Sequence, residues 1–108
     1  MPPTTVSSGV FHVREGQVEA FLERWADLIV WTHHHHPAMG RASLSQCDSD
    51  PQRFTSHAHW TSAEARQAWR AEPGYRERSA RCRELCDEYL AGDYSEVLAF
   101  GGDTEGDD

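Results

Sequence analysis

The sequence predicts an α+β fold of the ferredoxin-like kind, a four-stranded sheet with helices on one face. Segments rich in β-branched or alternating residues are separated by segments whose apolar residues recur every three or four positions, and these are the periods of strands and helices. The segments follow one another as β-α-β-β-α-α-β, and 108 residues suffice for one hydrophobic core. We therefore expect a single domain over residues 1–101 and an acidic tail at 102–108.

The first strand and the first helix are separated by a change of period. Residues 10–14 are a β-branched and aromatic run that ends at Glu15-Gly16, which predicts a strand. Apolar residues then recur at helical spacing from Val18 to Thr32, which predicts an amphipathic helix of about four turns. Because Pro37 cannot continue a helix, we expect the helix to end at the histidine run 33–36 and a loop to begin there.

The middle of the chain reads as a hairpin. Residues 40–48 and 52–60 have strand character, and the Ser49-Asp50-Pro51 sequence between them is typical of a turn. The two strands should therefore pair in an antiparallel manner.

Two more helices and a last strand complete the chain. Thr61 and Glu64 form a capping box, Thr at the N-cap and Glu at N3, which predicts a short helix to about Ala71. A third helix is expected over residues 75–90, and residues 94–100 are expected to form the fourth strand. The third helix has an apolar stripe made of Tyr75, Cys82, Leu85, Cys86, Tyr89 and Leu90.

Composition excludes several classes of protein. The net charge is −8 and there is no basic run, so nucleic acid and anionic membranes are poor partners. No apolar segment approaches the roughly 20 residues of a membrane span, and the N-terminus lacks the pattern of a signal peptide. Three cysteines without a secretion signal indicate reduced thiols, so we expect a cytoplasmic protein.

One face of the predicted sheet has no helix to cover it. Val10, His12, Thr55, His57 and His59 should lie on this face, and a second identical chain is the simplest partner for it. The three histidines allow two interpretations, a metal site or a polar part of the dimer interface. No Asp or Glu joins them in an obvious ligand pattern, so no metal is expected.

The opposite face should line a pocket under the helices. Strand alternation puts Ser56, Ala58 and Trp60 on the same side. Residues from the first strand and from two helices would join them and make the pocket aromatic and apolar, as flat organic ligands require. The expected lining is Phe11, Val13, Trp25, Ser56, Ala58 and Trp69. The alternative interpretation is that these side chains are only core.

The histidine run should lie at the same end of the sheet as Trp60. The first strand and the first helix run in opposite directions, so the segment after the helix returns to the end where the third strand finishes. His34 or His35 could then act as a base near the pocket mouth, since histidine titrates near neutral pH. The alternative is a solvated loop without a role.

Three stretches of the sequence resemble one known family. VREGQVEAFLERW, HPAMG and SDPQRFTSHAHWTSAEARQAW resemble the antibiotic biosynthesis monooxygenase (ABM) superfamily of dimeric α/β barrels, over about residues 9–100. The most specific piece is Trp60 at the end of a strand, followed nine residues later by Trp69. The resemblance implies a homodimer with facing sheets and a pocket in each subunit between sheet and helices.

The sequence departs from particular members of that family. Trp60 matches the pocket Trp of the polyketide oxygenases, but Ser56 stands where they carry Asn and Arg66 where they carry Tyr. Trp69 matches the Trp of the haem-degrading members, whereas Ser79 and Gly9 stand near the positions of their haem-ligating His and their Asn. The resemblance therefore argues against haem degradation and against identical anthrone chemistry.

The expected function is that of a cofactor-independent monooxygenase. It would oxidise an aromatic polyketide-like, quinol or phenol substrate with O₂ in the pocket, with Trp60 and Trp69 holding the ring and His34 or His35 taking the proton. No Gly-rich nucleotide fingerprint is present, so no cofactor is expected. Two alternatives stay open: a polyketide cyclase or isomerase that does not use O₂, and a non-catalytic ligand- or metal-binding dimer.

Overall fold

The computed structural model describes residues 4–101, so the predicted acidic tail at 102–108 lies outside the described part of the chain. Four strands and three helices follow one another as expected. Their bounds are β1 Thr4–Val13, α1 Val18–His35, β2 Met39–Cys47, β3 Asp50–Trp60, α2 Ala63–Ala71, α3 Pro73–Arg83 and β4 Cys86–Glu96.

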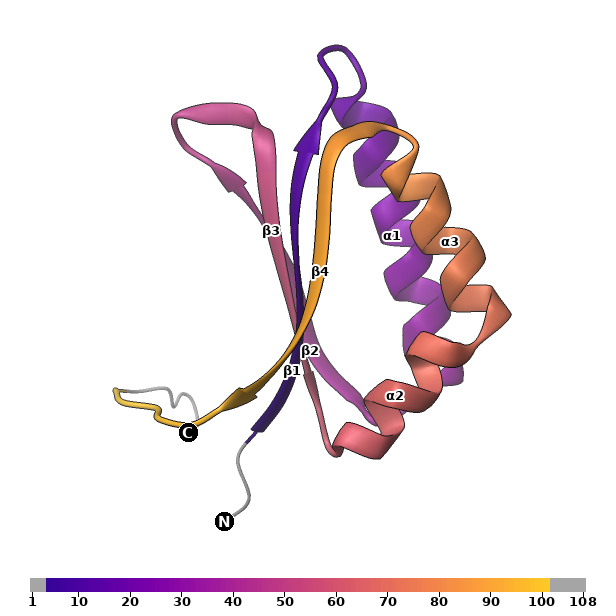
Figure 1. Cartoon of the computed structure of the whole chain (residues 1–108), viewed down its shortest axis with the longest axis vertical. Helices are drawn as coiled ribbons and strands as arrows, with labels where there is room; N and C mark the ends of the chain where they lie inside the picture. Colours follow the sequence, from indigo (N-terminus) through magenta and orange to yellow (C-terminus); the bar gives the residue numbers. More distant parts are fainter. Residues whose placement is uncertain (1–3, 102–108) are drawn as a thin grey trace.

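The strands form one antiparallel sheet in the order β2-β3-β1-β4, and all three helices pack against one face of it (Figure 1). The other face is uncovered, and the β2–β3 hairpin curls outward on that side. This arrangement confirms the predicted ferredoxin-like α+β class.

Strand β1 is longer than the pattern predicted. It begins at Thr4 rather than residue 10 because it is the central strand, with β3 on one edge and β4 on the other. Backbone hydrogen bonds on both edges hold the polar Thr-Ser segment extended although its side chains are not typical of strands. Its alternate residues are buried, as expected for a strand with one covered face.

The end of the third helix was predicted wrongly. Helix α3 ends at Arg83, and the strand begins at Cys86, where a helix had been expected as far as residue 90. Cys86 pairs with Val13, and the Arg14 N–H donates to the Leu85 carbonyl at 2.9 Å. Pairing with the central strand therefore outweighs a local spacing that fits a helix.

Smaller boundaries also differ, and two of them concern the helices that border the site. The N-cap of α2 is Ser62, whose hydroxyl accepts a hydrogen bond from the Ala65 N–H at 3.1 Å, so the expected Thr61 cap is wrong by one residue. Helix α1 continues through His35, so the predicted histidine loop is the last helical turn. Pro37 stops the helix one turn later than expected because the residues before it still form helical hydrogen bonds, such as His36 N–H to the Thr32 carbonyl.

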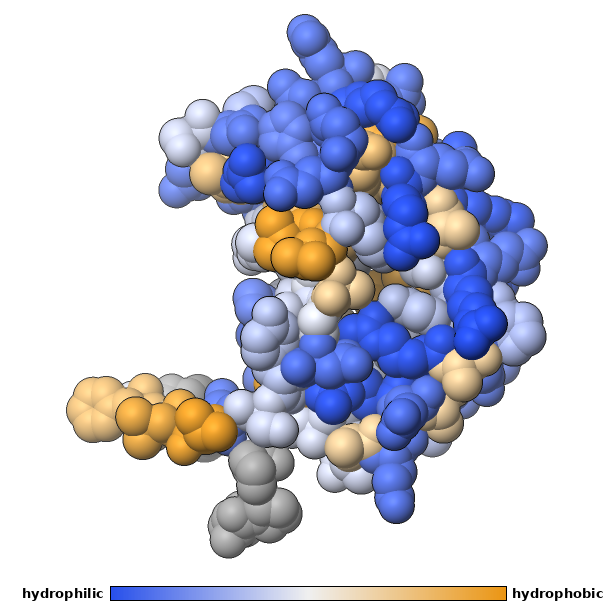
Figure 2. Space-filling model, in the orientation of Figure 1, coloured by the Kyte–Doolittle hydropathy of each residue, from blue (hydrophilic) through white to orange (hydrophobic). Residues whose placement is uncertain are grey.

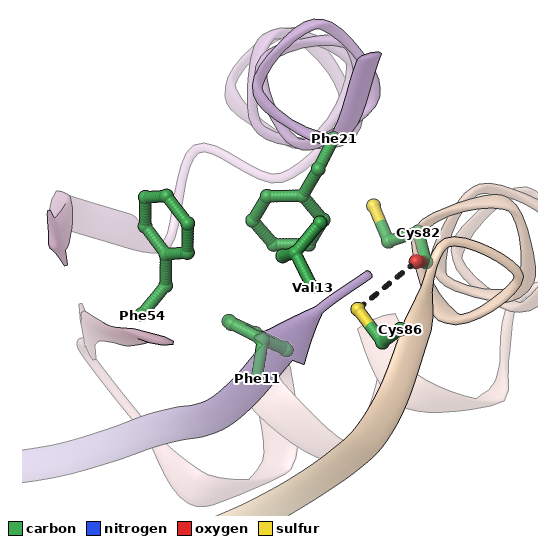
Figure 3. Packing of buried hydrophobic residues seen from close by; sticks show 6 residues of the cluster. All are labelled: Phe11, Val13, Phe21, Phe54, Cys82 and Cys86. Carbon is green, nitrogen blue, oxygen red and sulfur yellow. Dashed lines mark hydrogen bonds between the residues drawn. The ribbon is translucent and has the colours of Figure 1, made fainter. Parts of the chain in front are cut away.

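The main core lies between β1, β3, α1 and α3 (Figure 3). Phe21 packs against Phe11 and Phe54, with ring centroids 5.3 Å apart in each pair. The Cys82 and Cys86 side chains are buried here, and the Cys86 thiol donates to the Cys82 carbonyl at 3.4 Å. Burial raises the pKa of Cys82 to about 12 and that of Cys86 to about 11, so both thiols stay protonated and serve as core residues.

A second, smaller core lies at the opposite end of the sheet. Met39, Ala58, Trp60 and Trp69 are buried there, between the ends of β2 and β3 and helix α2. The two cores leave a gap between them under the helices, and this gap forms the candidate site.

Candidate functional site

A cavity lies between the helix-covered face of the sheet and helices α1, α2 and α3. Its apolar walls include Phe11 of β1, Trp25 of α1, Trp69 of α2 and Tyr89 of β4. Its polar lining includes Ser7, Ser56, Arg70 and Tyr75. The cavity is therefore an aromatic slot with a small number of polar groups, as small-molecule sites commonly are.

The cavity is narrow. About 40 Å³ is open to a water-sized sphere, whereas an engineered apolar cavity that holds benzene measures about 150 Å³. An aromatic ring can enter only if side chains on the wall move apart. Trp25 and Tyr89 are half-buried and are not enclosed on all sides, so they are the aromatic groups freest to move.

Five of the predicted lining residues border this cavity: Phe11, Trp25, Ser56, Ala58 and Trp69. Val13 does not, because it lies one pleat further along β1 in the main core, where it is fully buried. Trp60 faces the helices as expected, but it lies behind Trp69 and is not part of the cavity wall. Strand alternation gave the correct face for both residues but not their position along the sheet.

Two buried indoles are held by hydroxyl groups. The Trp60 Nε1–H donates to Ser7 Oγ at 3.1 Å, and the Trp69 Nε1–H donates to Thr32 Oγ1 at 2.9 Å. The ring centroids of the two Trp residues are 4.9 Å apart. Because both N–H groups have partners, the rings are fixed in place and Trp69 presents a defined surface to the cavity.

Sequence reasoning missed Arg70 and Tyr75, which bring the main polar groups of the site. The Arg70 Nη1 donates to the Tyr75 hydroxyl at 2.5 Å, and its Nε and Nη2 lie 3.0 and 2.7 Å from Asp93 Oδ1. The guanidinium also lies over the Trp69 ring, 4.9 Å from its centroid. Tyr75 could have been found from the sequence, because it belongs to the predicted apolar stripe of the third helix. Nothing in the sequence pointed to Arg70, since an arginine that follows a buried Trp on a helix is normally a surface residue.

Gly9 makes space for the site. A Cβ at this position would lie 2.5 Å from Phe11 Cζ and 3.1 Å from Ser56 Oγ. The Phe11 ring packs on Phe21 and Tyr89 and cannot move aside easily. A residue without a side chain is therefore needed where β1 passes the cavity.

The histidine run lies near Trp60, but the nearest member is His36. Its ring centroid is 6.3 Å from that of Trp60, and its Nε2 is 3.3 Å from Glu72 Oε1. His34 and His35, the two predicted bases, are exposed on the last turn of α1, and neither borders the cavity. His35 Nδ1 lies 2.9 Å from the Trp31 carbonyl.

Of the histidines predicted for the uncovered face, His57 and His59 are two residues apart on β3, whereas His12 of β1 pairs with Arg53 nearer the other end of that strand. His12 lies between two carboxylates, with Nδ1 3.1 Å from Asp87 Oδ1 and Nε2 3.3 Å from Asp50 Oδ2. The hydrogen bond to Asp87 raises the pKa of His12 and lowers that of Asp87. Within residues 4–101, no three His, Cys, Asp or Glu side chains are grouped so that they could hold a metal ion.

Burial raises the pKa of the Tyr89 phenol. Tyr89 therefore stays neutral in the cavity wall and is not a base.

None of the helices in the described part of the chain is long and apolar enough to cross a membrane.

The family model described as "Antibiotic biosynthesis monooxygenase" matches residues 6–81. No curated protein sequence matches the chain.

Solved structures share the fold. A variant of SnoaB, a cofactor-independent oxygenase from Streptomyces nogalater, superposes with a TM-score of 0.82 at 18% identity, over 93% of this chain and 99% of that one. Protein SO0527 from Shewanella oneidensis superposes with a TM-score of 0.78 at 22% identity, over 92% of this chain and 96% of that one. At such identities the likeness establishes the fold alone.

Proposed function

The chain belongs to the antibiotic biosynthesis monooxygenase family, and on that premise we propose that it is a cofactor-independent monooxygenase of a small aromatic substrate. The substrate is a phenol, a quinol or a polyketide-like aromatic compound, and the oxidant is O₂. The single observation that carries the proposal is the aromatic cavity, walled by Trp25 and Trp69 and polar only at a few points. SnoaB, a cofactor-independent oxygenase, has the same fold.

The proposed chemistry needs no bound cofactor because the substrate supplies the electrons. Loss of a proton from the substrate gives an electron-rich anion, which passes an electron to O₂ and combines with the reduced oxygen at a ring carbon. Protonation gives a hydroperoxide, and loss of water leaves a carbonyl. For a substrate that reacts at a CH₂ group, the CH₂ group and O₂ give a carbonyl and water. For a phenol with a free para C–H, the phenol and O₂ give a quinone and water.

The protein's part is to hold the ring, exclude water and stabilise the anion. Trp69 provides a fixed flat surface, and Trp60 supports it from behind through ring contact. Phe11, Ala58 and Trp25 complete the apolar walls. Because the cavity is narrow, we expect Trp25 and Tyr89 to swing outward when a ring enters and to close over it afterwards.

The identity of the proton acceptor stays a prediction. His34 and His35 lie outside the cavity, so either would have to act through a water chain. His36 is closer to Trp60 and half-buried, and Glu72 lies beside it. Alanine variants of His34, His35 and His36, made singly, test all three: an unchanged rate for every one removes the histidine run from the mechanism.

The decisive experiment is oxygen uptake by the purified protein with anthrone or a methylhydroquinone, with no cofactor added. With ¹⁸O₂, one labelled atom should appear in the product and the other in water. Trp69→Ala should weaken binding of the substrate about tenfold or more, because it removes an aromatic contact surface. Trp31→Ala is the matched control, since Trp31 does not border the cavity.

Other outcomes point to other functions. Loss of the substrate's chromophore without O₂ uptake would indicate a cyclase or isomerase in the same cavity. Tight binding without turnover would indicate a ligand-binding protein. A transition metal retained in stoichiometric amount after chelator treatment would indicate a metal-binding dimer.

We also propose that the chain is a homodimer. The uncovered sheet face carries Val10 opposite Leu90 and Val6 opposite Tyr94, and directly opposed residues point to the same side. Figure 2 shows one hydrophobic patch among hydrophilic residues on this side and a hydrophobic projection at the C-terminal end, where Val97, Leu98 and Phe100 are exposed. Apolar surface of this kind marks an interaction site, and a second copy is the occupant we propose.

The three cysteines are unpaired thiols, which fits a reducing compartment, so we propose that the protein acts in the cytoplasm.

A further inference from the structure

We propose that Arg70 and Tyr75 form an anion-binding pair in the cavity, and that the site therefore selects aromatic ligands with an ionisable hydroxyl group and holds them as the oxyanion. This inference rests on the same cavity as the proposed function. It adds the ionised form in which the phenol or enol is held, and two binding residues that neither the sequence nor the comparisons assign.

Arg70 is positioned to receive an anion. Its side chain is 20% exposed and borders the cavity, and the Trp69 ring below it and Asp93 beside it restrict its position. A guanidinium is planar and presents fixed N–H groups, which suits an oxygen anion on a flat ligand.

The local charges are not balanced. Asp93 is the carboxylate bonded to Arg70, and it also faces Arg66, with 3.6 Å between Arg66 Nε and Asp93 Oδ1. The Arg66 Nη1 donates to the carbonyls of Val6 and Tyr94, which carry no charge. Within the described residues, two cations therefore share one carboxylate, and that carboxylate is 45% exposed to water. One positive charge is left over beside an apolar cavity, in a chain whose net charge is −8.

Tyr75 completes the pair. Its hydroxyl oxygen accepts the hydrogen bond from Arg70, so its own O–H remains free to donate. Among residues 4–101, the hydrogen bond from Arg70 is the only one in which the Tyr75 hydroxyl takes part. An oxyanion in the cavity would accept this O–H and interact with the guanidinium, and charge-assisted hydrogen bonds are roughly twice as strong as neutral ones.

The consequence for a ligand is a lower pKa. When a phenol binds, its O–H bond breaks, the proton leaves to solvent, and the oxyanion stays beside Arg70. An opposite charge within about 4–6 Å lowers the pKa of an acid by about 1–3 units. A methyl ether of the same ring has no proton to lose and gains nothing from the pair. For the proposed oxygenation, the pair thus raises the fraction of substrate present as the reactive anion.

A purely structural role for Arg70 predicts a different effect of substituting its partner Asp93. Arg70 also ties α2 to β4 through Asp93, so its loss would loosen the two elements. In that case the loss of Asp93 should have the same effect as the loss of Arg70. In the anion-binding role the two substitutions act in opposite directions, because Asp93 competes with the ligand for the guanidinium.

The test uses 4-nitrophenol, a single-ring probe whose yellow colour reports its ionisation and which O₂ does not oxidise. Absorbance titrations across pH give the pKa of the bound and the free probe, and 4-nitroanisole serves as the non-ionisable analogue. With the wild-type protein, the bound probe should have a pKa lower by about one unit or more, equivalent to a tenfold change. The anisole should bind at least about tenfold more weakly at a pH above the pKa of the probe.

The variants then separate the roles. Arg70→Met should abolish the pKa shift, Arg70→Lys should keep part of it, and Tyr75→Phe should reduce it. Asp93→Asn should leave the shift unchanged or increase it. Arg76→Met is the matched control, since Arg76 is an exposed arginine on α3 away from the cavity, and it should behave as wild type. Circular dichroism and urea unfolding establish that each variant is folded at the temperature of the titration.

The results that would overturn the inference are equally specific. Equal losses in Arg70→Met and Asp93→Asn, or an unshifted pKa in the wild type, exclude an anion-binding pair. A lowered pKa of bound 4-nitrophenol, together with no O₂ uptake on anthrone or a methylhydroquinone, would support the anion-binding pair and contradict the proposed monooxygenase. Failure of both 4-nitrophenol and 4-nitroanisole to bind would exclude the cavity as a ligand site, and both proposals would fall together.

Discussion

Thr32 has a single hydroxyl that serves two elements at once. It is fully buried, donates to the Leu28 carbonyl within α1 at 2.8 Å and accepts from the Trp69 Nε1–H of α2. Without the hydroxyl, the Trp69 N–H would be buried without a partner, which is costly. Thr32 thus links the helix that covers the sheet to the Trp that walls the cavity.

We expect Thr32→Val to destabilise the protein by about 1–3 kcal/mol, because the substitution keeps the shape and removes only the hydrogen bonds. Urea unfolding followed by tryptophan fluorescence measures the change. Thr61→Val is the control, since Thr61 is exposed. Equal stability of the two variants would contradict the assigned role of the hydroxyl.

His12 predicts a pH dependence of stability. The hydrogen bond to Asp87 raises the pKa of His12 in the folded state, and the negative charges of Asp87 and Asp50 act in the same direction. A raised histidine pKa stabilises the fold fully below the unfolded pKa of about 6.5, and this contribution is lost as the pH rises through the folded pKa. The lowered pKa of Asp87 keeps its carboxylate ionised in the acidic range.

We therefore expect His12→Gln to lose more stability relative to wild type at about pH 5.5 than at about pH 9, where the wild-type histidine is neutral. Urea unfolding at the two pH values measures the difference. A loss of the same size at both would show that the charge of His12 does not contribute.

At the scale of elements, the start of α2 depends on Ser62. The Ser62 hydroxyl accepts the Ala65 N–H, which is one of the free donors at the start of the helix. We expect Ser62→Ala to cost about 1 kcal/mol of unfolding free energy, and Thr61→Ala, its neighbour outside the cap, to cost much less. Thermal or urea unfolding of the pair decides between the two capping positions, and a larger loss at Thr61 would contradict the observed cap.

Strand β1 carries a second element-level prediction. Gly9→Ala places a methyl group against the Phe11 ring, which is held by its packing neighbours. We expect a loss of about 1–3 kcal/mol and weaker binding of 4-nitrophenol, because the ring can shift only into the cavity or the core.

Gly40→Ala in β2 is the control, since its nearest non-neighbouring atom would be 3.5 Å away, an ordinary contact. Equal effects of the two substitutions would mean that the loss comes from strand propensity and not from the cavity.

For the whole molecule, the proposed homodimer places the uncovered sheet face at its interface. Leu90 is 64% exposed on this face, so a charge there should not disturb the monomer core. We expect Leu90→Glu to shift the protein from dimer to monomer, because two copies would bring two carboxylates into an apolar interface. Analytical ultracentrifugation measures the mass.

Val30→Glu is the matched control, since Val30 is 56% exposed on α1, away from this face. A monomeric wild type, or dissociation by Val30→Glu as readily as by Leu90→Glu, would contradict the proposed interface.

Local sequence patterns were sufficient to predict much of the fold. The helical spacing from Val18 and the alternation of β3 depend on short-range geometry, so they predicted α1, the side on which Trp60 lies and the ferredoxin-like order of elements. The odd cysteine count correctly indicated free thiols. Family membership followed from the same residues, since the match spans residues 6–81.

Tertiary structure alone decided the rest. Residues 86–90 have a helical spacing, but they form a strand because β1 offers a free edge for backbone hydrogen bonds. The His run looked like a loop because Pro37 follows it, yet the helix continues to His35. Arg70 and Tyr75 meet only because Pro73 begins a new helix between them and β4 brings Asp93 alongside. Periodicity reports which face a side chain occupies, whereas a polar site depends on distances between elements, and packing alone sets those distances.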